Sequence, residues 1–189
     1  DDLAKKGLAA PNAQGEAGEI EVDVKRVYNE ANLLSHVLGY TSGVQKEDLL
    51  NNSSLSSVDS VGRLGVESTY DNLLRGQGGR EIVEVDAIGR KVSVLGRQEP
   101  EVGRDLQLTI DSDLQKKTFE ALSRAVDKAA KKGAVVVSDP NTGQILALVS
   151  LPAFDPNDIG RFTSDINKPF LNRVISGEYP PGSTFKIVS

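Results

Sequence analysis

Two apolar segments joined by a tight turn constrain the second half of this chain more than any other feature. Residues 134–138 and 144–150 are almost entirely aliphatic, and the link between them reads Asp139-Pro140-Asn141-Thr142-Gly143. Proline presets one turn angle and glycine accepts a positive φ, so this link is typical of a hairpin. Strands this apolar are usually covered on both faces. We therefore expect them to hold a central, two-sided position in a sheet.

A helix is predicted just before this hairpin, over residues 112–132. Asp111 or Ser112 can cap its start, because a side-chain oxygen there accepts a hydrogen bond from the first free N–H groups. Gly133 is expected to end it, and alternation over 106–110 predicts a short strand ahead of it. The helix is predicted from a mainly apolar face whose residues recur mostly every fourth position: Leu114, Thr118, Phe119, Leu122, Val126 and Ala130.

The beginning of the chain mixes strand, helix and loop signals. Residues 19–27 alternate, with Ile20, Val22 and Val24 on one side, which indicates a strand. Residues 31–38 predict a short helix that Gly39 stops, since glycine commonly follows a helix C-terminus. Residues 51–60 are rich in Ser and Asn and are typical of a loop.

The middle of the chain predicts one more helix and one hairpin. An apolar helix face over 66–74 is ended by the glycine-rich run 76–79, and its members are Val66, Tyr70, Leu73 and Leu74. Strand-like runs at 82–87 and 91–95 surround a hairpin turn. Residues 97–105 are polar and contain Pro100 and Gly103. We place a domain boundary there, which gives an α+β fold with domains at 1–104 and 105–189.

The composition narrows the possible functions. The 189 residues are 38% hydrophobic and 26% charged, with a net charge of −5 and no cysteine. A nucleic-acid-binding face is usually basic, so no nucleic-acid partner is expected, and the basic cluster at 128–132 is interpreted as a solvated helix end. Thiolate metal sites and disulfides are excluded. A Ser-His-Asp triad would need His36, the only histidine, for which we expect a structural role.

No segment of the sequence is apolar over the ~20 residues that a membrane helix requires. Methionine is absent, and the chain begins at Asp1 without a signal peptide. We therefore expect the sequence to be an internal piece of a longer protein, whose own anchoring it does not reveal.

The chemistry-bearing feature is a Ser-x-x-Lys pair, Ser183 and Lys186. On a helix, residues three apart share a face, so the amine can reach the hydroxyl. Serine is a weak nucleophile near neutral pH and needs a base, and lysine can serve if its pKa is lowered. N–H groups at a helix start would favour a developing negative charge on the substrate. Taken alone the pair is a weak signal, and an exposed serine beside a solvated lysine is the simpler interpretation.

The residues around the pair add a family resemblance. Tyr179-Pro180-Pro181-Gly182-Ser183-Thr184-Phe185-Lys186 resembles the active-serine motif of class B penicillin-binding proteins. Residues 133–156 resemble the start of the transpeptidase domain of that family, and 171–177 its approach to the serine. Residues 65–76 and 84–90 resemble its non-catalytic pedestal, or dimerisation, domain. The resemblance covers nearly everything after residue 19 and is closer to the cell-elongation branch than to the division branch.

The resemblance implies a peptidoglycan D,D-transpeptidase that cross-links stem peptides through an acyl-enzyme on Ser183, with Lys186 as the general base. β-Lactams would acylate the same serine, and no cofactor or metal is implied. The implied parent is held in the cell membrane by one N-terminal anchor, has its domains on the extracytoplasmic side, and works with a glycan-polymerising synthase. The family's Ser-x-Asn and Lys-Thr-Gly-type motifs are absent from these 189 residues, so we expect this piece by itself to be inactive.

Two other functions stay open: a non-catalytic pedestal or interaction module, and a β-lactam sensor or β-lactamase relative. Other conspicuous residues have simpler explanations. Asp139 and Asp155 each precede a proline and are interpreted as turn residues rather than an acid–base pair. Asn172 and Arg173 match the family and are expected to make structural bonds. Tyr179 could touch substrate or pack beside the prolines.

Overall fold

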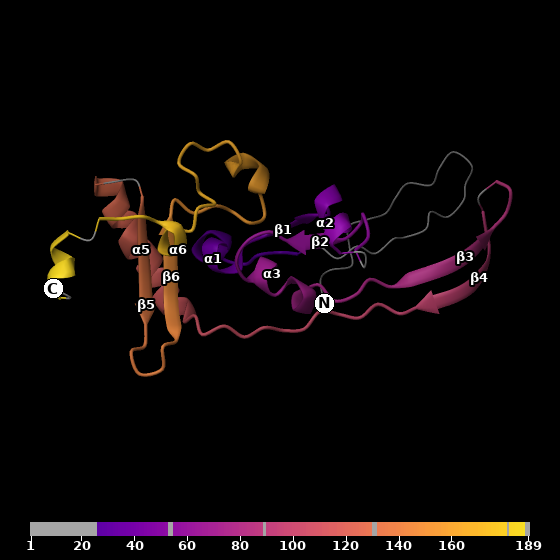
Figure 1. Ribbon diagram of the computed structural model, residues 1–189, viewed down its shortest axis with the longest axis horizontal. Coiled ribbons are helices and arrows are strands. Elements are labelled where there is room, and N and C mark those ends of the chain that lie inside the picture. The colour runs from indigo at the N-terminus through magenta and orange to yellow at the C-terminus, as the bar shows by residue number, and fades with distance from the viewer. Residues whose placement is uncertain (1–25, 53–54, 89, 130–131, 181, 188–189) are drawn as a thin grey trace.

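The computed structural model describes residues 26–52, 55–88, 90–129, 132–180 and 182–187. The described chain forms an elongated molecule with three two-stranded antiparallel sheets placed along its length (Figure 1). The strand predicted at 19–27 lies almost wholly outside the described residues, and its last two residues, Arg26 and Val27, are not in a strand.

Helices and strands are mixed along the chain without a repeating pattern. They are α1 (Ala31–Leu38), β1 (Thr41–Gly43), α2 (Lys46–Asn51), β2 (Ser60–Gly62), α3 (Gly65–Thr69), α4 (Asp71–Leu74), β3 (Arg80–Val85), β4 (Lys91–Gln98), α5 (Ser112–Ala129), β5 (Gly133–Ser138), β6 (Ile145–Leu151), η1 (Ile159–Phe162), α6 (Arg173–Ser176) and η2 (Gly182–Ile187), where η marks a 3₁₀ helix. The α+β class predicted from the sequence is confirmed.

Helix α1 has the predicted bounds and ends at Gly39. This glycine has a φ of 79°, and its N–H donates to the Ser35 carbonyl at 2.8 Å. A Cβ at this position would lie 1.8 Å from the Leu64 carbonyl oxygen, so only glycine allows the end of α1 to approach the start of α3 this closely.

The single helix predicted over residues 66–74 is wrong, because the chain forms two short helices that meet at Tyr70. Tyr70 has φ −113° and ψ 23°, outside the helical range. The Asp71 carboxylate accepts a hydrogen bond from the Gly62 N–H at 2.8 Å and pairs with Arg75 at 3.2 Å. The bond from Gly62 anchors Asp71 as the start of α4, and the pair with Arg75 supports the turn that follows; a periodic pattern does not reveal the first of these.

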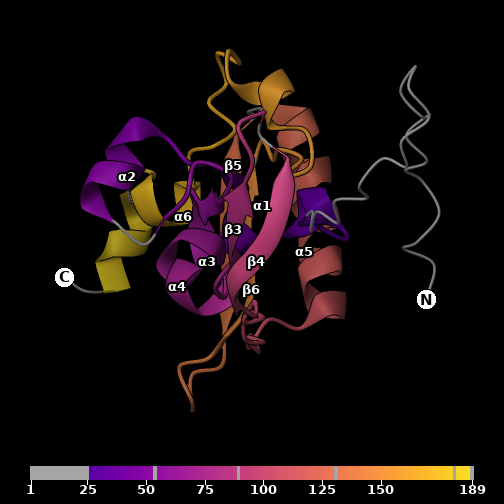
Figure 2. The same cartoon turned by 90° about the vertical axis from the view of Figure 1, so that its right-hand side faces the viewer.

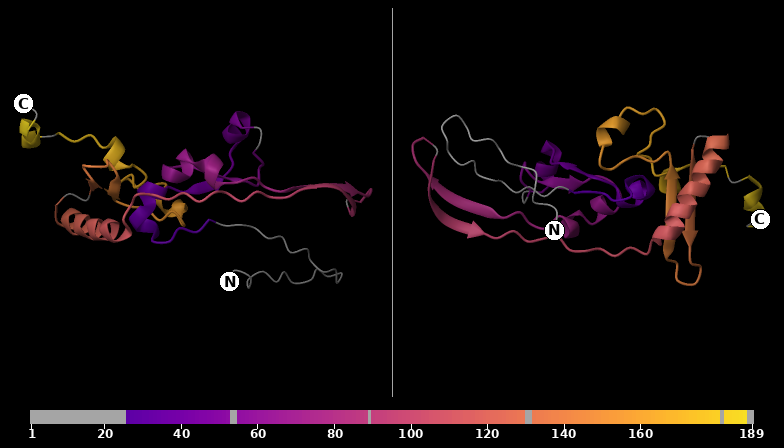
Figure 3. Two further views of the ribbon diagram at one scale, coloured as in Figure 1. Left: turned by 90° about the horizontal axis from the view of Figure 1, so that it is seen from below. Right: turned by 180° about the vertical axis from the view of Figure 1, so that it is seen from behind.

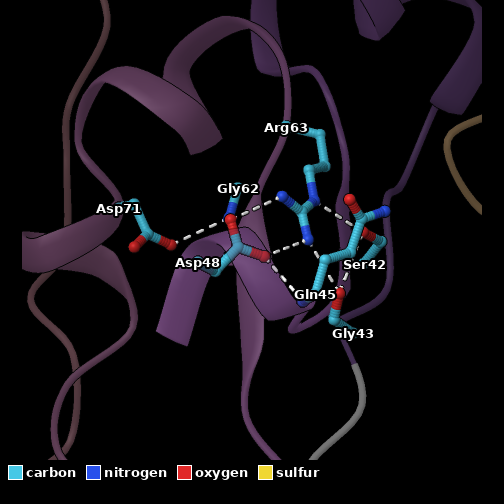
Figure 4. A network of polar contacts seen from close by, with 7 residues as sticks. All are labelled: Ser42, Gly43, Gln45, Asp48, Gly62, Arg63 and Asp71. Atoms are coloured by element: carbon cyan, nitrogen blue, oxygen red, sulfur yellow. Dashed lines mark hydrogen bonds and ion pairs between the residues drawn. The ribbon is translucent and has the colours of Figure 1, made fainter. Parts of the chain in front are cut away.

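An arginine at the centre of the first half joins β1, β2 and α2. The Arg63 guanidinium makes a bidentate ion pair with Asp48, at 2.9 and 2.7 Å, and also donates to the Ser42 hydroxyl and the Gly43 carbonyl (Figure 4). Asp48 in turn accepts from the Gln45 N–H at the start of α2. The fixed fork of the guanidinium matches the carboxylate, which makes this contact more specific than a simple ion pair.

Strands β3 and β4 form the predicted hairpin with two register shifts. β3 starts at Arg80 and ends at Val85, two residues before the end of the predicted run, and β4 extends to Gln98. Asp86 organises the turn by accepting from the Ile88 and Arg90 N–H groups at 3.0 Å. Figures 1 and 3 show this ribbon projecting away from the other elements, at the opposite end of the molecule from η2.

Strands β5 and β6 confirm the hairpin predicted in the second half. Asp139 holds its turn by accepting from the Asn141 N–H and the Thr142 hydroxyl, and Gly143 has a φ of 73°. The expected central position in a wider sheet is wrong for the described chain, where each of these strands has one neighbouring strand. Helices cover β6 instead. Helix α5 packs across one face of the hairpin, as the right-hand panel of Figure 3 shows, and α1 lies beside the edge of β6 that does not pair with β5 (Figures 1 and 2).

Helix α5 is capped by Asp111, whose side chain accepts from the Leu114 N–H at 2.8 Å. The strand predicted at 106–110 is wrong: this segment is extended, but Thr109 and Asp111 reach β6 through only one side-chain and one backbone bond, too few for a ladder. Helix α5 is described as far as Ala129, the last part of the helix predicted over 112–132 lies outside the described residues at 130 and 131, and Gly133 begins β5. A Cβ there would lie 3.0 Å from Leu122 of α5, so glycine permits close packing of helix on strand.

Candidate active site

The Ser-x-x-Lys pair lies in η2, at the end of the molecule opposite the β3–β4 hairpin (Figure 1). Gly182, just before the serine, has a φ of 57°, which glycine adopts without strain. In a 3₁₀ helix, side chains three residues apart eclipse one another. Ser183 and Lys186 therefore project from the same side of η2, and both are exposed.

Neither side chain of the pair is held by a neighbour in the part of the chain that the structure describes. The Ser183 hydroxyl and the Lys186 ammonium make no hydrogen bond or ion pair with another described residue. The structure thus places the two groups on one side of η2. It does not show the hydrogen bond between the serine hydroxyl and the lysine amine that general-base catalysis requires.

The segment leading to η2 is fixed to the sheet by α6. The side chain of Asn172 caps this helix by accepting from the Val174 N–H at 3.1 Å. Arg173 is 5% exposed, and its guanidinium donates to the carbonyls of Asn167, Lys168 and Leu171. These bonds confirm the structural roles expected for Asn172 and Arg173.

Ser150 of β6 connects α6 to the sheet directly. Its buried hydroxyl donates to the Leu171 carbonyl at 3.2 Å and accepts from the Arg173 N–H at 3.0 Å. One hydroxyl therefore bridges both sides of the turn that starts α6. The sequence identified Ser150 only as part of an apolar strand.

Beyond α6 the chain passes Gly177 and Tyr179 before it reaches η2. The Tyr179 ring lies against Gly177, where an added Cβ would come within 2.5 Å of Cε2, and Tyr179 is 58% exposed. A shallow cavity of about 330 Å³ lies beside it over β5 and α6, lined by Ala134, Val135, Val136, Arg173, Val174, Gly177 and Tyr179. Neither Ser183 nor Lys186 is among its lining residues.

Three polar residues attach α1 and the segment before it to the second half, and the sequence singled out only the histidine among them. Gln115 of α5 is 1% exposed, and its amide bonds the Leu148 N–H and carbonyl at 2.8 Å and the Leu33 carbonyl at 2.6 Å. It thus replaces a neighbouring strand at the edge of β6 while also holding α1. The sequence offered one signal of this role: Gln115 is a polar residue four positions before Phe119, beside the apolar stripe of the helix.

The second and third of these residues are His36 and Asn157. The His36 Nε2 lies 2.7 Å from the Pro169 carbonyl, with the ring 9% exposed, so its expected structural role is confirmed. Asn157 bonds both the N–H and the carbonyl of Tyr28 at 3.0 Å. Because turn residues are usually polar, the sequence around Asn157 gave no sign of this tertiary contact.

The two aspartates considered as an acid–base pair are turn residues. Asp139 accepts from its own turn, and the Asn141 N–H above all lowers the pKa of its carboxyl group. Asp155 likewise accepts from the Asn157 N–H and side-chain amide, at 2.8 and 3.1 Å. Both interpretations made from the proline that follows each aspartate are confirmed.

Neither a metal centre nor a membrane span appears among the described residues. No three or more His, Asp or Glu side chains gather there in an arrangement suited to a metal ion. Within the same ranges, no helix combines the length and the apolar character needed to cross a bilayer.

Comparison with known proteins identifies two domains in the order expected from the sequence. The family model of the penicillin-binding protein dimerisation domain matches residues 13–108, and that of the penicillin-binding protein transpeptidase domain matches residues 133–189. The second match contains Ser183, Lys186 and the whole β5–β6 hairpin.

Curated relatives agree with these matches. The peptidoglycan D,D-transpeptidase MrdA of Acinetobacter baumannii is 38% identical over 178 residues, which cover 88% of this chain and 26% of that protein. MrdA of Escherichia coli K12 is also 38% identical, over 89% of this chain and 28% of that protein. The chain therefore spans little more than a quarter of the length of these relatives.

Solved structures show the same likeness. A complex of penicillin-binding protein PBP2 and MreC from Helicobacter pylori has a TM-score of 0.69 and 32% identity over 85% of this chain and 31% of that one. Pseudomonas aeruginosa PBP2 in complex with WCK 5153 has a TM-score of 0.61 and 31% identity over 85% of this chain and 33% of that one. The MrdA and PBP2 relatives confirm the predicted likeness to the cell-elongation branch. Because the dimerisation-domain match alone covers more than half of the chain and the transpeptidase match follows it, the chain belongs to the class B penicillin-binding proteins.

Proposed function

We propose that this chain is the part of a peptidoglycan D,D-transpeptidase that links the pedestal to the nucleophile, with Ser183 as the nucleophile and Lys186 as the general base. One observation carries the proposal: the transpeptidase family match, residues 133–189, includes a Ser-x-x-Lys pair whose members project from one side of η2. The names of the MrdA relatives support the reaction class.

The proposed reaction proceeds in two acyl-transfer steps. The Ser183 Oγ attacks the carbonyl carbon of the penultimate D-Ala of a stem peptide, while the neutral amine of Lys186 takes the hydroxyl proton. The tetrahedral intermediate collapses, its C–N bond breaks, and the terminal D-Ala leaves with a proton. An amine of a neighbouring stem then attacks the ester, the bond to Oγ breaks, and Oγ regains a proton.

The proposed partners follow from this chemistry. Donor and acceptor stem peptides are the substrates, and β-lactams acylate Ser183 because they resemble D-Ala-D-Ala. We also propose a glycan-polymerising membrane synthase as a partner, a single N-terminal anchor in the cell membrane, and an extracytoplasmic location for these domains. The domain boundary proposed for the chain is 104/105, although α1 from the first domain packs on β6 of the second.

The alternative of a non-catalytic pedestal module is supported by one observation. The described side chains of Ser183 and Lys186 are exposed, and neither bonds to another described residue. The alternative of a β-lactamase relative has less support, because the dimerisation-domain match covers residues 13–108 and simple β-lactamases lack such a domain.

The decisive experiment measures acylation of the complete protein that contains this segment by a fluorescent penicillin. Ser183→Ala should abolish the covalent adduct, since the acylated atom is gone. Lys186→Ala should slow acylation by about 10²–10⁴-fold, the usual contribution of a general base. Intact-mass and peptide mapping should place the wild-type adduct on Ser183.

Matched controls come from the same chain. Ser176→Ala in α6 and Lys117→Ala in α5 change exposed residues of the same types and should leave the acylation rate unchanged. An adduct that persists in Ser183→Ala would assign the nucleophile elsewhere. An unchanged rate in Lys186→Ala would remove the lysine from the mechanism while leaving the serine in place.

A further inference from the structure

The junction between the two halves of the molecule is built around a buried histidine. His36 lies on α1, in the dimerisation-domain match, and its Nε2 is 2.7 Å from the carbonyl of Pro169, in the transpeptidase match. Its other ring nitrogen, Nδ1, is 3.3 Å from the Ser35 hydroxyl. Because the Pro169 carbonyl can only accept, Nε2 must carry the hydrogen of the neutral ring. Nδ1 is then an acceptor, and the Ser35 hydroxyl can donate to it.

Aromatic rings enclose the imidazole on the side of the 152–172 loop. Phe154 is fully buried, and its ring centroid lies 5.2 Å from that of His36 in an edge-to-face arrangement. Phe170 and Tyr40 extend the cluster, with centroids 4.9 Å and 6.1 Å from that of Phe154. An apolar site of this kind favours the neutral imidazole over the charged one.

The charged groups around this site offer little compensation for a second positive charge. The elements around α1 carry both signs of charge, while β6 carries no titratable group. The groups are Glu67 on α3; Asp113, Lys116, Lys117, Glu120, Arg124, Asp127 and Lys128 on α5; Asp155, Asp158, Arg161, Asp165 and Lys168 in the loop; Arg173 on α6; and Tyr40 after α1. Burial lowers the pKa of His36, the bond to Pro169 opposes this, and Arg173 is the charged group that lowers it further. Glu67 is engaged by Arg26 at 3.0 Å, and Asp155 by Asn157.

We propose that His36 makes the attachment between the two halves sensitive to pH: protonation of the ring loosens the contact between α1 and the 152–172 loop. A proton on Nδ1 would face the Ser35 hydroxyl, which would have to turn its own hydrogen toward the Asn32 carbonyl at 3.4 Å. The imidazolium would then be buried beside Phe154 with Arg173 as its charged neighbour. The contact weakens because the charged ring is more stable in water than in the buried site, so protonation favours the open form.

The direction of the effect follows from linkage. The pKa of folded His36 lies below the ordinary 6.5, so the open form binds the proton more readily. The contribution of the closed junction is complete above about pH 6.5 and is lost as the pH falls through the folded-state value. Each unit of lowering corresponds to about a tenfold change in the ratio of closed to open forms at low pH.

The test uses the 189-residue chain, in which His36 is the only histidine. One imidazole Hε1 signal is therefore expected by NMR, and its titration midpoint should lie below 6.5. Hydrogen exchange of α1, corrected for its intrinsic pH dependence, should accelerate as the pH is lowered from roughly 7.5 to 5. His36→Gln retains a donor toward Pro169 without titrating, so its corrected exchange should not change over this range.

A matched control moves the histidine to the surface of the same helix. Asn32→His in the His36→Gln background places the only imidazole at an exposed position of α1. Its titration should be ordinary, and α1 exchange should stay independent of pH. A wild-type midpoint at or above 6.5, or equal acceleration in wild type and His36→Gln, would overturn the proposal. Circular dichroism at pH 7.5 first establishes that the wild type and both variants are folded, so that an ordinary midpoint cannot come from an unfolded chain.

Discussion

Replacement of Gln115 by alanine is expected to detach α1 from the second half and to destabilise the whole chain. The Gln115 amide is the point where α5, β6 and α1 meet, and its side chain is 1% exposed. Alanine removes both polar atoms and leaves three backbone groups without their partner: the Leu148 N–H, the Leu148 carbonyl and the Leu33 carbonyl.

The expected loss in the free energy of unfolding is about 3 kcal/mol. A buried polar group left unsatisfied costs about 1–3 kcal/mol. The sum for three groups overstates the loss, because Leu33 and Leu148 are only half-buried and water can reach them once the side chain is truncated. Alanine also returns a few tenths of a kcal/mol through its higher helix propensity. A loss of this size is a large fraction of the ~5–15 kcal/mol that holds a domain folded.

Urea denaturation followed by circular dichroism measures this loss. Lys116→Ala changes the neighbouring, exposed residue of the same helix and should stay within about 0.5 kcal/mol of wild type. Gln115→Glu keeps the acceptor for the Leu148 N–H but turns a carboxylate oxygen toward the two carbonyls, so it should be no milder than alanine at neutral pH. A loss below about 1 kcal/mol in Gln115→Ala would refute the argument that this amide satisfies the edge of β6.

Three further outcomes are expected. Asp111→Ala should lower the free energy of unfolding by about 1 kcal/mol by removing the cap of α5, whereas Asp111→Ser should retain most of it, as thermal denaturation can show. Gly39→Ala should lower the free energy of unfolding by about 2 kcal/mol or more, because the new Cβ would lie 1.8 Å from a backbone oxygen at a φ of 79°. Gly43 has open space around it, so Gly43→Ala should lower it far less, and urea denaturation of both variants measures the difference. The 189-residue chain incubated with a fluorescent penicillin should form an adduct on Ser183 far more slowly than the complete protein does. The reason is that, within the described residues, Ser183 and Lys186 are exposed and do not bond to each other. Intact-mass measurements that show equal rates of adduct formation in the two proteins would contradict this.

Local features of the structure followed directly from the sequence. The bounds of α1, the Asp111 cap, the β5–β6 hairpin and the turn at Asp139 all depend on residues within a few positions of one another. Capping, turn formation and periodic burial act over that distance, so their signals are present in the order of the residues. The Ser-x-x-Lys pair and its proline-rich approach were found in the same way, as a short motif.

Tertiary contacts decided the features that the sequence left open or predicted wrongly. The helix predicted over 66–74 is divided at Tyr70, where the Asp71 carboxylate reaches back to the Gly62 N–H. The segment 106–110 is not a strand because it makes too few bonds to β6. The outer edge of β6 is satisfied by a glutamine from a helix rather than by another strand. The attachment of α1 to the second half joins residues more than 80 positions apart. No local preference specifies such pairings, because their free energy arises only when the folded chain brings the groups together and excludes water from them.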